Sequence, residues 1–343
     1  MNKKTTNILF TCAGRRNYLI NYFKEVLKGD GKIFAGDYQK DAPSLIDADV
    51  AIQMPRVDDI NYITFLKKIC TENAIDAVIS LNDLELPLLS KHKKELENNG
   101  QLVIISDSSV IEIAFDKWQT YEFLKSNKFK TPKTYISLKK AIIDLSDEKI
   151  NFPLVLKPRW GSGSINIDIV ETLEELDLAY RLQKIKLSRT ILADVSKSTL
   201  DESILIQEKI NGTEYGMDIL NDLNTDYIGS FAREKLSMRS GETDKAKSVI
   251  KPELEEVGEK ISKNLKHIGN LDIDVFVNDL GVYVLELNPR FGGGYPFSHQ
   301  AGINTAAIYI EWIKGNTSIS KFINYRENIA FSKCDRLIQI KNI

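Results

Sequence analysis

The chain has 343 residues, 43% of them hydrophobic and 27% charged, and its formal net charge at pH 7 is −2. This composition indicates a globular protein of roughly one to three domains, and the small net charge argues against nucleic acid or a membrane surface as a partner. Three separated cysteines and three scattered histidines predict neither a disulfide framework nor a zinc site. The apolar run near the N-terminus spans only residues 8–10, so we expect a cytoplasmic protein without a signal peptide or membrane helix.

Strand and helix patterns alternate through the first hundred or so residues. Strands are expected at residues 7–12, 32–35, 77–80 and 102–106, and helices at residues 18–28, 60–72 and 84–98. Such alternation predicts a parallel sheet with helices on both faces, and so an α/β N-terminal domain over residues 1–108. The glycine fingerprint of dinucleotide-binding folds is absent after the first strand, and Asp37 is better explained as a turn carboxylate than as a ribose ligand.

The remaining residues, 109–343, predict a second domain of α+β type. A helix is expected over residues 110–127, before the break at Thr131-Pro132. Further strands are expected at residues 152–157, 165–170, 205–210 and 214–220, a helix at residues 173–185, and a hairpin that pairs residues 273–278 with 281–287. Because antiparallel strands dominate, this part forms a separate unit, in which a small lid subdomain is expected at about residues 128–210.

The strand around residue 286 carries the strongest chemical signal in the sequence. Glu286, Asn288 and Arg290 are spaced two residues apart, so their side chains share one face of a strand. Carboxylate and amide oxygens suit Mg²⁺, and a planar guanidinium suits phosphate or carboxylate. The glycines at positions 292–294 allow the backbone to approach a ligand closely. These features predict a place where magnesium and a nucleoside triphosphate meet an anionic substrate.

A second signal is Lys157, which ends an apolar strand and precedes a Gly/Ser loop. The loop contains Gly161, Ser162, Gly163 and Ser164. Its backbone N–H groups can bind phosphate, and the lysine can reach a further phosphate. The spacing differs from that of a P-loop. A hairpin loop without a ligand is the alternative, because Gly/Ser loops are common.

A third signal lies where the strand at residues 205–210 reaches a polar edge. The backbone of Glu208, Lys209 and Ile210 can bind adenine there, and the carboxylate of Glu214 can accept hydrogen bonds from both ribose hydroxyls. On these residues alone, an exposed and charged strand edge is the simpler explanation.

Taken in order, these motifs resemble the ATP-grasp superfamily. The resemblance is carried by Asp116-Lys117, Lys157 with its Gly/Ser loop, Glu208, Ile210, Glu214, Asp274, Glu286, Asn288 and Arg290. It covers roughly residues 5–310, and the first hundred residues resemble the domain that precedes the ATP-grasp domain in that superfamily. The chain is similar to single-module proteins that resemble one half of the carbamoyl-phosphate synthase large subunit.

The resemblance implies roles for the nucleotide-binding positions. Lys117 and Lys157 would contact the phosphates from two sides of a cleft, and Lys157 would also count among the catalytic residues. The loop at residues 161–164 would close over the β- and γ-phosphates. Residues 208–210 would bind adenine, largely through the backbone, and Glu214 would hold the ribose.

The resemblance also implies a metal site. Asp274, Glu286 and Asn288 would hold one or two Mg²⁺ ions that bridge the phosphates, and Mn²⁺ is compatible with the same ligands. Asp272 shares the strand face of Asp274, but the spacing from Glu286 favours Asp274. Arg290 would stabilise charge on the transferred phosphoryl group or hold the acceptor carboxylate.

Residues 231–245 are dense in charge, which by itself indicates a mobile surface loop. In the resembling proteins the corresponding loop faces substrate and phosphate, so Arg233 is the first candidate for a catalytic residue on the substrate side. Further candidates in this segment are Lys235, Thr243 and Lys245.

Two carboxylates follow the strand at residues 77–80. Asp83 and Glu85 lie at its C-terminal end, where open α/β sheets place ligands, and they could bind a substrate amine. Capping of the next helix is an equally good explanation for Asp83.

These inferences lead to an ATP- and Mg²⁺-dependent carboxylate–amine or carboxylate–thiol ligase that acts on small molecules through an acylphosphate. One alternative is a module of a carbamoyl-phosphate-synthase-type enzyme that phosphorylates bicarbonate or carbamate. Another is a non-catalytic, ATP-binding regulatory protein. The expected partners are a small carboxylate and an amine, without nucleic acid or membrane, and a homodimer is compatible with the sequence.

Overall fold

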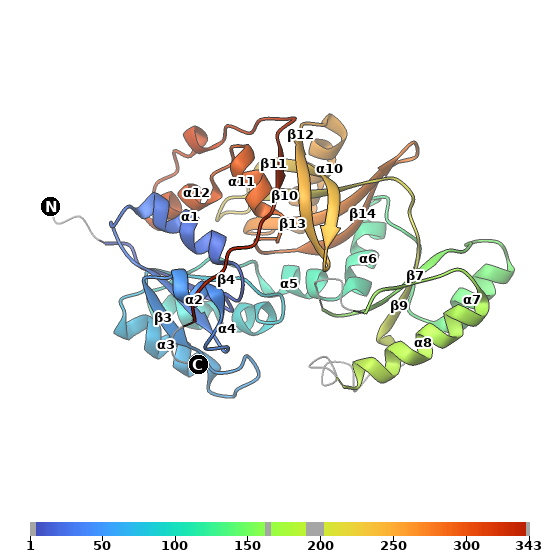
Figure 1. The fold of residues 1–343 in the computed structure, drawn as a ribbon, viewed down its shortest axis with the longest axis horizontal. Helices are drawn as coiled ribbons and strands as arrows, with labels where there is room; N and C mark the ends of the chain where they lie inside the picture. Colours follow the sequence, from blue (N-terminus) through green and yellow to red (C-terminus); the bar gives the residue numbers. More distant parts are fainter. Residues whose placement is uncertain (1–4, 162–165, 190–201, 341–343) are drawn as a thin grey trace.

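The computed structural model describes residues 5–161, 166–189 and 202–340, in which the strands form three sheets (Figure 1). The first sheet has five strands in the order β3-β2-β1-β4-β5, and the pairs between them are parallel. The other two sheets have four and six strands and are antiparallel in their pairings. The predicted succession of an α/β unit and an ATP-grasp-like α+β unit is therefore confirmed.

The parallel sheet is built from short apolar strands with helices on both faces. Its strands are β1 (Ile8–Thr11), β2 (Ile33–Asp37), β3 (Val50–Gln53), β4 (Ala77–Ser80) and β5 (Leu102–Val103). Its helices are α1 (Asn17–Leu27), α2 (Pro43–Asp47), α3 (Tyr62–Glu72) and α4 (Leu86–Asn98). Neighbouring residues of β1 enter different cores, because Ile8 and Phe10 pack with α1 and Leu9 packs with α3 and α4.

The four-stranded sheet has its own small core. Its order is β6 (Thr134–Tyr135), β9 (Ile204–Glu208), β7 (Leu154–Pro158) and β8 (Asp168–Val170), with helices α7 (Leu138–Ser146) and α8 (Leu173–Leu187). Leu154, Leu156 and Ile206 of the sheet pack against Leu176 and Tyr180 of α8. In Figure 1 these elements form a lobe at the right of the molecule. This lobe carries Lys157 and Glu208 to one side of a cleft.

The six-stranded sheet forms the other side of that cleft. Its order is β14 (Gly281–Asn288), β13 (Gly269–Asn278), β10 (Thr213–Asn221), β11 (Tyr227–Arg239), β12 (Glu242–Val249) and β15 (Ala330–Ser332). The later helices are α10 (Pro252–Leu265), α11 (Tyr295–Ala301), α12 (Thr305–Ile313) and the 3₁₀-helix η2 (Ser320–Phe322). Residues 231–245 belong to the hairpin of β11 and β12, so the mobile-loop interpretation of this segment was wrong. The hairpin turns at Ser240 and Gly241, whose φ angles are +51° and +79°.

The predicted helix at residues 110–127 is interrupted at Asp116. The structure has α5 (Ser108–Phe115) and α6 (Lys117–Ser126), with Asp116 extended between them at φ −100° and ψ 106°. The Asp116 carboxylate accepts a hydrogen bond from the Trp118 backbone N–H and pairs with Arg159, at 2.8 Å from Nε and 2.6 Å from Nη2. A capping carboxylate with a bidentate ion pair explains the break. As a result, Lys117 begins a new helix beside the end of β7.

The end of the ATP-grasp-like unit returns to the first sheet. Phe291, Ile308 and Tyr309 are fully or almost fully buried in the core that also contains Phe10 and Phe23. Figure 1 shows α12 next to α1, and the two helices are in contact. Residues far apart in the sequence therefore share one core.

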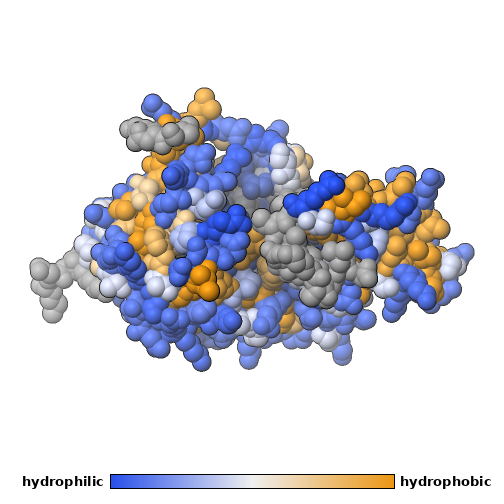
Figure 2. Space-filling model, turned by 90° about the horizontal axis from the view of Figure 1, so that it is seen from below, coloured by the Kyte–Doolittle hydropathy of each residue, from blue (hydrophilic) through white to orange (hydrophobic). Residues whose placement is uncertain are grey.

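The surface seen in Figure 2 is mostly hydrophilic, with separate hydrophobic groups rather than one continuous apolar face. Leu178, Leu182 and Ile185 on α8 are among the exposed apolar side chains. In the described part of the chain, no helix combines the length and the hydrophobicity needed to cross a membrane.

The ion pair of Asp116 gives a test of the fold. Asp116→Ala removes the helix cap and the bidentate partner of a largely buried Arg159, which keeps only its longer pair with Glu202 at 3.5 Å. We therefore expect the free energy of unfolding to fall by about 2 kcal/mol in urea titration. Asp116→Asn keeps a capping oxygen and should recover part of this loss. Asp147→Ala removes an exposed partner of Lys149 and should cost at most about 0.5 kcal/mol. Equal losses for Asp116→Ala and Asp147→Ala would contradict the assignment.

Candidate active site

A cavity of about 490 Å³ lies between the four-stranded and six-stranded sheets. Many of the predicted site residues line it, namely Lys117, Lys157, Gly161, Glu208, Lys209, Ile210, Glu214, Asp274 and Glu286. Its volume is in the range of cofactor and substrate sites. Ser162, Gly163 and Ser164, which were predicted to bind phosphate, lie outside the described residues.

The walls of the cavity are partly apolar. Val155 and Ile169 come from the four-stranded sheet, and Phe276 and Leu285 come from the opposite sheet. Such walls can enclose a planar base, while the edge at residues 208–210 supplies backbone hydrogen-bonding groups. Sequence analysis missed these four residues, although their apolar strand positions hinted at a buried surface.

Two lysines line the cavity, Lys157 from β7 of the lobe and Lys117 from the start of α6. Burial lowers the pKa of Lys157 to about 8; Glu286 partly opposes this shift and Lys117 adds to it. Burial likewise lowers the pKa of Lys117, and Glu286 opposes it. The Lys117 ammonium donates to the carbonyl of Gly161. Two desolvated ammonium groups close to each other favour an anionic ligand.

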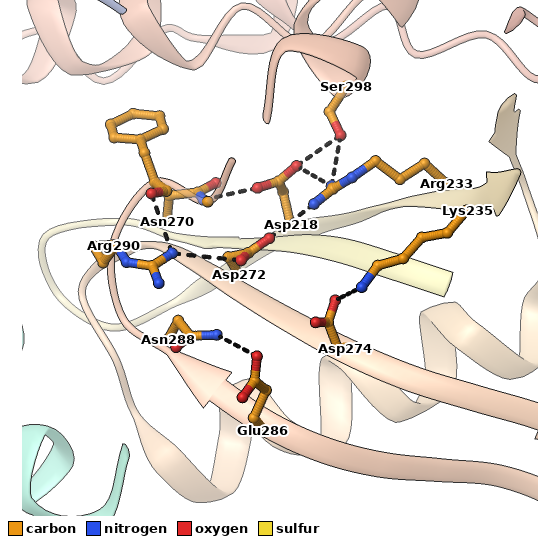
Figure 3. Close-up of polar contacts among 12 residues, drawn as sticks. Asp218, Arg233, Lys235, Asn270, Asp272, Asp274, Glu286, Asn288, Arg290 and Ser298 are labelled. Carbon is orange, nitrogen blue, oxygen red and sulfur yellow. Dashed lines mark hydrogen bonds and ion pairs between the residues drawn. The ribbon is translucent and has the colours of Figure 1, made fainter. Parts of the chain in front are cut away.

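The predicted metal ligands lie on two neighbouring strands. Asp274 of β13 is the register partner of Glu286 on β14, and Asp272 is the partner of Asn288. Asn288 Nδ2 lies 3.5 Å from Glu286 Oε1 (Figure 3). Among the described residues, no three His, Cys, Asp or Glu side chains form a metal cluster. These hard oxygen donors fit Mg²⁺ only as a partial ligand set, as is usual where phosphate and water complete the coordination.

The two neighbouring aspartates have different surroundings. Asp274 pairs with Lys235 at 2.7 Å, and Lys235 also pairs with Glu214 at 2.7 Å. Burial alone would lower the pKa of Lys235, but Asp274 and Glu214 raise it above its usual value. Asp272 instead pairs with Arg233 at 2.8 Å. Asp274 lines the cavity and Asp272 does not appear in its lining.

Arg233, predicted to be a catalytic residue on the substrate side, is buried in the interior and does not line this cavity. Its guanidinium lies 2.6 Å from Asp218 and 2.8 Å from Asp272, and its side chain is 1% exposed. A methyl group at Gly216 or Gly294 would come within 2.9 Å or 2.2 Å of the guanidinium. The glycines thus make room for a buried arginine. Of the other candidates in this segment, Thr243 is buried and Lys245 is exposed.

Arg290 connects the six-stranded sheet to the first sheet. Its Nη2 lies 2.7 Å from Asp83 Oδ2, and its Nη1 lies 3.5 Å from Asp272 Oδ2 (Figure 3 shows the second pair). Asp83, one of the two proposed amine ligands, therefore reaches the site as a partner of Arg290. Both side chains are almost completely buried. Sequence analysis did not foresee this pair, because it joins residues 207 positions apart.

Glu85, the other proposed amine ligand, lies inside the first sheet. It is fully buried and accepts hydrogen bonds from Thr11, Ser80 and Tyr62. Burial raises its pKa, although these donors oppose the shift. Its position indicates a structural role at the end of β1 and β4.

Two family models match the sequence. The model of the PylC-like N-terminal domain matches residues 8–104, and the model of the ATP-grasp domain matches residues 114–294. The chain belongs to the ATP-grasp family. The expected membership is thereby confirmed, and it supports an ATP-dependent ligase. The roles predicted for individual site residues of this ATP-grasp protein remain predictions.

Curated relatives of the ATP-grasp chain include the carbamoyl phosphate synthase large chain of Helicobacter pylori. The identity is 25% over 284 residues, which cover 78% of this chain and 25% of the relative. The ATP-grasp chain thus spans about a quarter of the length of that relative.

Solved structures support the same fold. The biotin carboxylase domain of 2-oxoglutarate carboxylase from Hydrogenobacter thermophilus, in complex with MgADP, ADP and bicarbonate, has a TM-score of 0.71 at 17% identity. The match covers 95% of this chain and 73% of that one. An L-amino acid ligase from Bacillus licheniformis has a TM-score of 0.68 at 19% identity. That match covers 95% of this chain and 78% of the ligase.

The lowered pKa of Lys157 predicts proton uptake when a triphosphate binds. Phosphate favours the ammonium, so binding raises the pKa from about 8 and the protein takes up a proton above that pH. The affinity for the triphosphate should therefore fall as the pH rises above the pKa of Lys157 in the free protein. Calorimetry at about pH 8.5, in buffers of different ionisation enthalpy, should detect this uptake.

Lys157→Arg is the matched variant, because arginine stays protonated throughout this range. It should reduce the uptake, and Lys117 would account for the remainder. An uptake that is the same in wild type and in Lys157→Arg would show that Lys157 does not bind the phosphates.

Proposed function

We propose that the chain is an ATP- and Mg²⁺-dependent ligase that converts a small carboxylate to an acylphosphate and joins it to an amine or a thiol. The observation that carries this proposal is the opposition of Lys117 and Lys157 to Glu286 in one cavity. Buried cations that face hard oxygen ligands suit a magnesium–triphosphate complex.

Each wall of the cavity would bind one part of ATP. The backbone of residues 208–210 would bind adenine between the apolar walls, and Glu214 would accept hydrogen bonds from the ribose. Lys117 and Lys157 would bind phosphate oxygens. The Lys157 ammonium would also stabilise charge that develops on the transferred phosphoryl group.

Glu286 and Asn288 would hold the metal, with Asp274 as a further candidate. Bound Mg²⁺ would neutralise phosphate charge and orient the triphosphate. The three side chains lie on adjacent strands, so the sheet presets their spacing and little rearrangement is needed.

The reaction has two steps. A carboxylate oxygen of the acceptor forms a bond to the γ-phosphorus, the β–γ bridging bond breaks, and ADP leaves. The amine or thiol then attacks the carbonyl carbon, loses a proton and expels phosphate. Arg290, oriented by Asp83 and Asp272, would hold the acceptor carboxylate or the phosphoryl group in line. No covalent protein nucleophile is required.

Phosphorylation of bicarbonate or carbamate is the second candidate. It is favoured by the similarity to carbamoyl phosphate synthase large chains and by the solved relative that contains bicarbonate with MgADP. The L-amino acid ligase at a similar TM-score supports the first candidate.

Glu286 gives a direct test of the metal-dependent chemistry. Glu286→Gln removes a negative ligand but keeps the side-chain size, so we expect ADP production to fall on the order of 10²–10³-fold with the fold intact. Glu253→Gln on the surface of α10 should leave turnover unchanged. ADP release at the wild-type rate by Glu286→Gln would contradict the assignment of Glu286 as a metal ligand.

The substrate class is tested by measuring ADP and phosphate release with ATP, Mg²⁺ and a panel of carboxylates crossed with amines and thiols. We expect release only when a carboxylate and a nucleophile are both supplied. Release with bicarbonate alone would favour the carbamoyl-phosphate-type reaction. Nucleotide binding without release across the panel would instead point to a regulatory ATP-binding protein.

A further inference from the structure

The loop between β1 and α1 carries two arginines next to a fixed turn. The Asp37 carboxylate accepts a hydrogen bond from the Gly14 backbone N–H at 2.7 Å, and Gly14 has a φ angle of +50°. A glycine adopts this left-handed conformation without steric cost. The next two residues are Arg15, which is exposed, and Arg16, which is partly buried. The proposed binding of ATP uses neither arginine.

This loop lies against the segment that carries Arg290. The Arg16 guanidinium donates to the carbonyl of Phe291, and the Tyr18 hydroxyl donates to the carbonyl of Gly292 at 3.2 Å. Two donors of the α/β unit thus bind the two carbonyls that directly follow Arg290 in the chain. The loop after β1 is therefore a neighbour of the place where the acyl group is proposed to be held.

Glu242 approaches the same segment from the α+β unit. Strand β12 begins at this residue, and a methyl group at Gly293 would come within 3.3 Å of its carboxylate. The Glu242 side chain is 63% exposed and pairs with Lys333 at 3.1 Å. Burial alone would raise the pKa of Glu242, but Lys333, Arg16 and Arg15 lower it overall. A carboxylate and two guanidinium groups from different units therefore lie around one glycine-containing loop.

The charges of this cluster are complementary to a zwitterion. A carboxylate can accept hydrogen bonds from an ammonium group, and a guanidinium can bind a carboxylate bidentately. Glu242 and Arg15 are both exposed, so a small molecule can reach them from solvent. The cluster is separate from the nucleotide cavity, because the described lining of that cavity contains neither residue.

We propose that Glu242, Arg15 and Arg16 form the subsite for the nucleophile, and that this nucleophile is an α-amino acid. Glu242 would bind its ammonium group, and the two arginines would bind its carboxylate. The amino group would then lie beside Arg290, where it attacks the acylphosphate after releasing a proton to solvent. The inference rests on the proposed function, since it specifies the amine of that reaction. A thiol without an amino group would leave Glu242 without a ligand.

A comparison of paired nucleophiles tests the role of Arg15. Each L-α-amino acid that supports ADP release is compared with the amine that lacks its carboxylate, at saturating ATP and acceptor carboxylate. Wild type should favour the amino acid by about tenfold or more in kcat/KM, because hydrogen bonds between charged groups are strong. Arg15→Ala should lower this preference by about tenfold. Lys94→Ala, which removes an exposed cation from α4, is the matched control and should retain it.

Glu242→Gln tests the binding of the ammonium group. The variant keeps the size of the side chain and an oxygen that can accept a hydrogen bond from Lys333. It should raise the KM for the amino acid about tenfold and change the KM for ATP less than about twofold. Lys333→Met removes the partner of Glu242 but keeps the carboxylate, so it should not raise the KM for the amino acid.

Two kinds of failure can be told apart. Wild-type kinetics in both Arg15→Ala and Glu242→Gln would overturn the subsite and leave the ligase reaction in place. Turnover with thiols or other amines, but with no amino acid, would do the same. Absence of ADP release with every combination of carboxylate and nucleophile would overturn the proposed function as well.

Discussion

A buried arginine holds together the sheet face on which the site is built. Arg233 of β11 reaches across β10 to bind Asp218 and Asp272, and Ser298 of α11 donates to Asp218 as well. Arg290 extends this network from Asp272 to Asp83 beyond the first sheet. Because these charges are withdrawn from water, loss of Arg233 would remove the ion-pair partner of the buried Asp218 and one of the two partners of Asp272, at high cost. The network therefore fixes the strands against each other.

The same network sets the distances within the site. Asp274 is two residues from Asp272 on β13, and Glu286 and Asn288 come before Arg290 along β14 and its end. The spacing of the proposed metal ligands thus depends on strands that the buried ion pairs hold in register. Lys117 and Lys157, which also line the cavity, are kept in place by different means, namely the helix start at Asp116 and the end of β7. Regular secondary structure thus positions these two lysines as it does the acidic side chains.

Sequence patterns predicted the features that depend on the local spacing of residues. The two-residue spacing placed Glu286 and Asn288 near each other on β14, whereas Arg290, expected on the same strand face, follows the end of that strand. The hairpin before them turned where expected, between Asn278 and Gly281. Family membership and fold followed from the order of motifs. Asp116 was singled out, yet its ion pair with Arg159, which interrupts the helix, could not be read from either residue alone.

Features that depend on distant partners escaped prediction. Arg233 lies on a charge-rich stretch that resembles a surface loop. Its ion pairs with Asp218 and Asp272 offset the free-energy cost of removing the guanidinium from water. The pairing of Arg290 with Asp83 likewise joins two separate units. A hydrophobic pattern reports that a side chain is buried or exposed on its own element. It carries no information about which charged partner another strand will supply.

The return of residues 291–312 to the first core has a consequence for how the chain folds. Phe10 and Phe23 emerge early during synthesis, but Phe291 and Tyr309, which complete their core, follow more than 260 residues later. The contacts are highly non-local, and such contacts slow folding because a long loop must close first. The N-terminal sheet of a nascent chain would thus expose an apolar face until the last helices arrive, and a truncated chain would carry this face permanently. Burial of the first core therefore depends on the synthesis of residues 291–312.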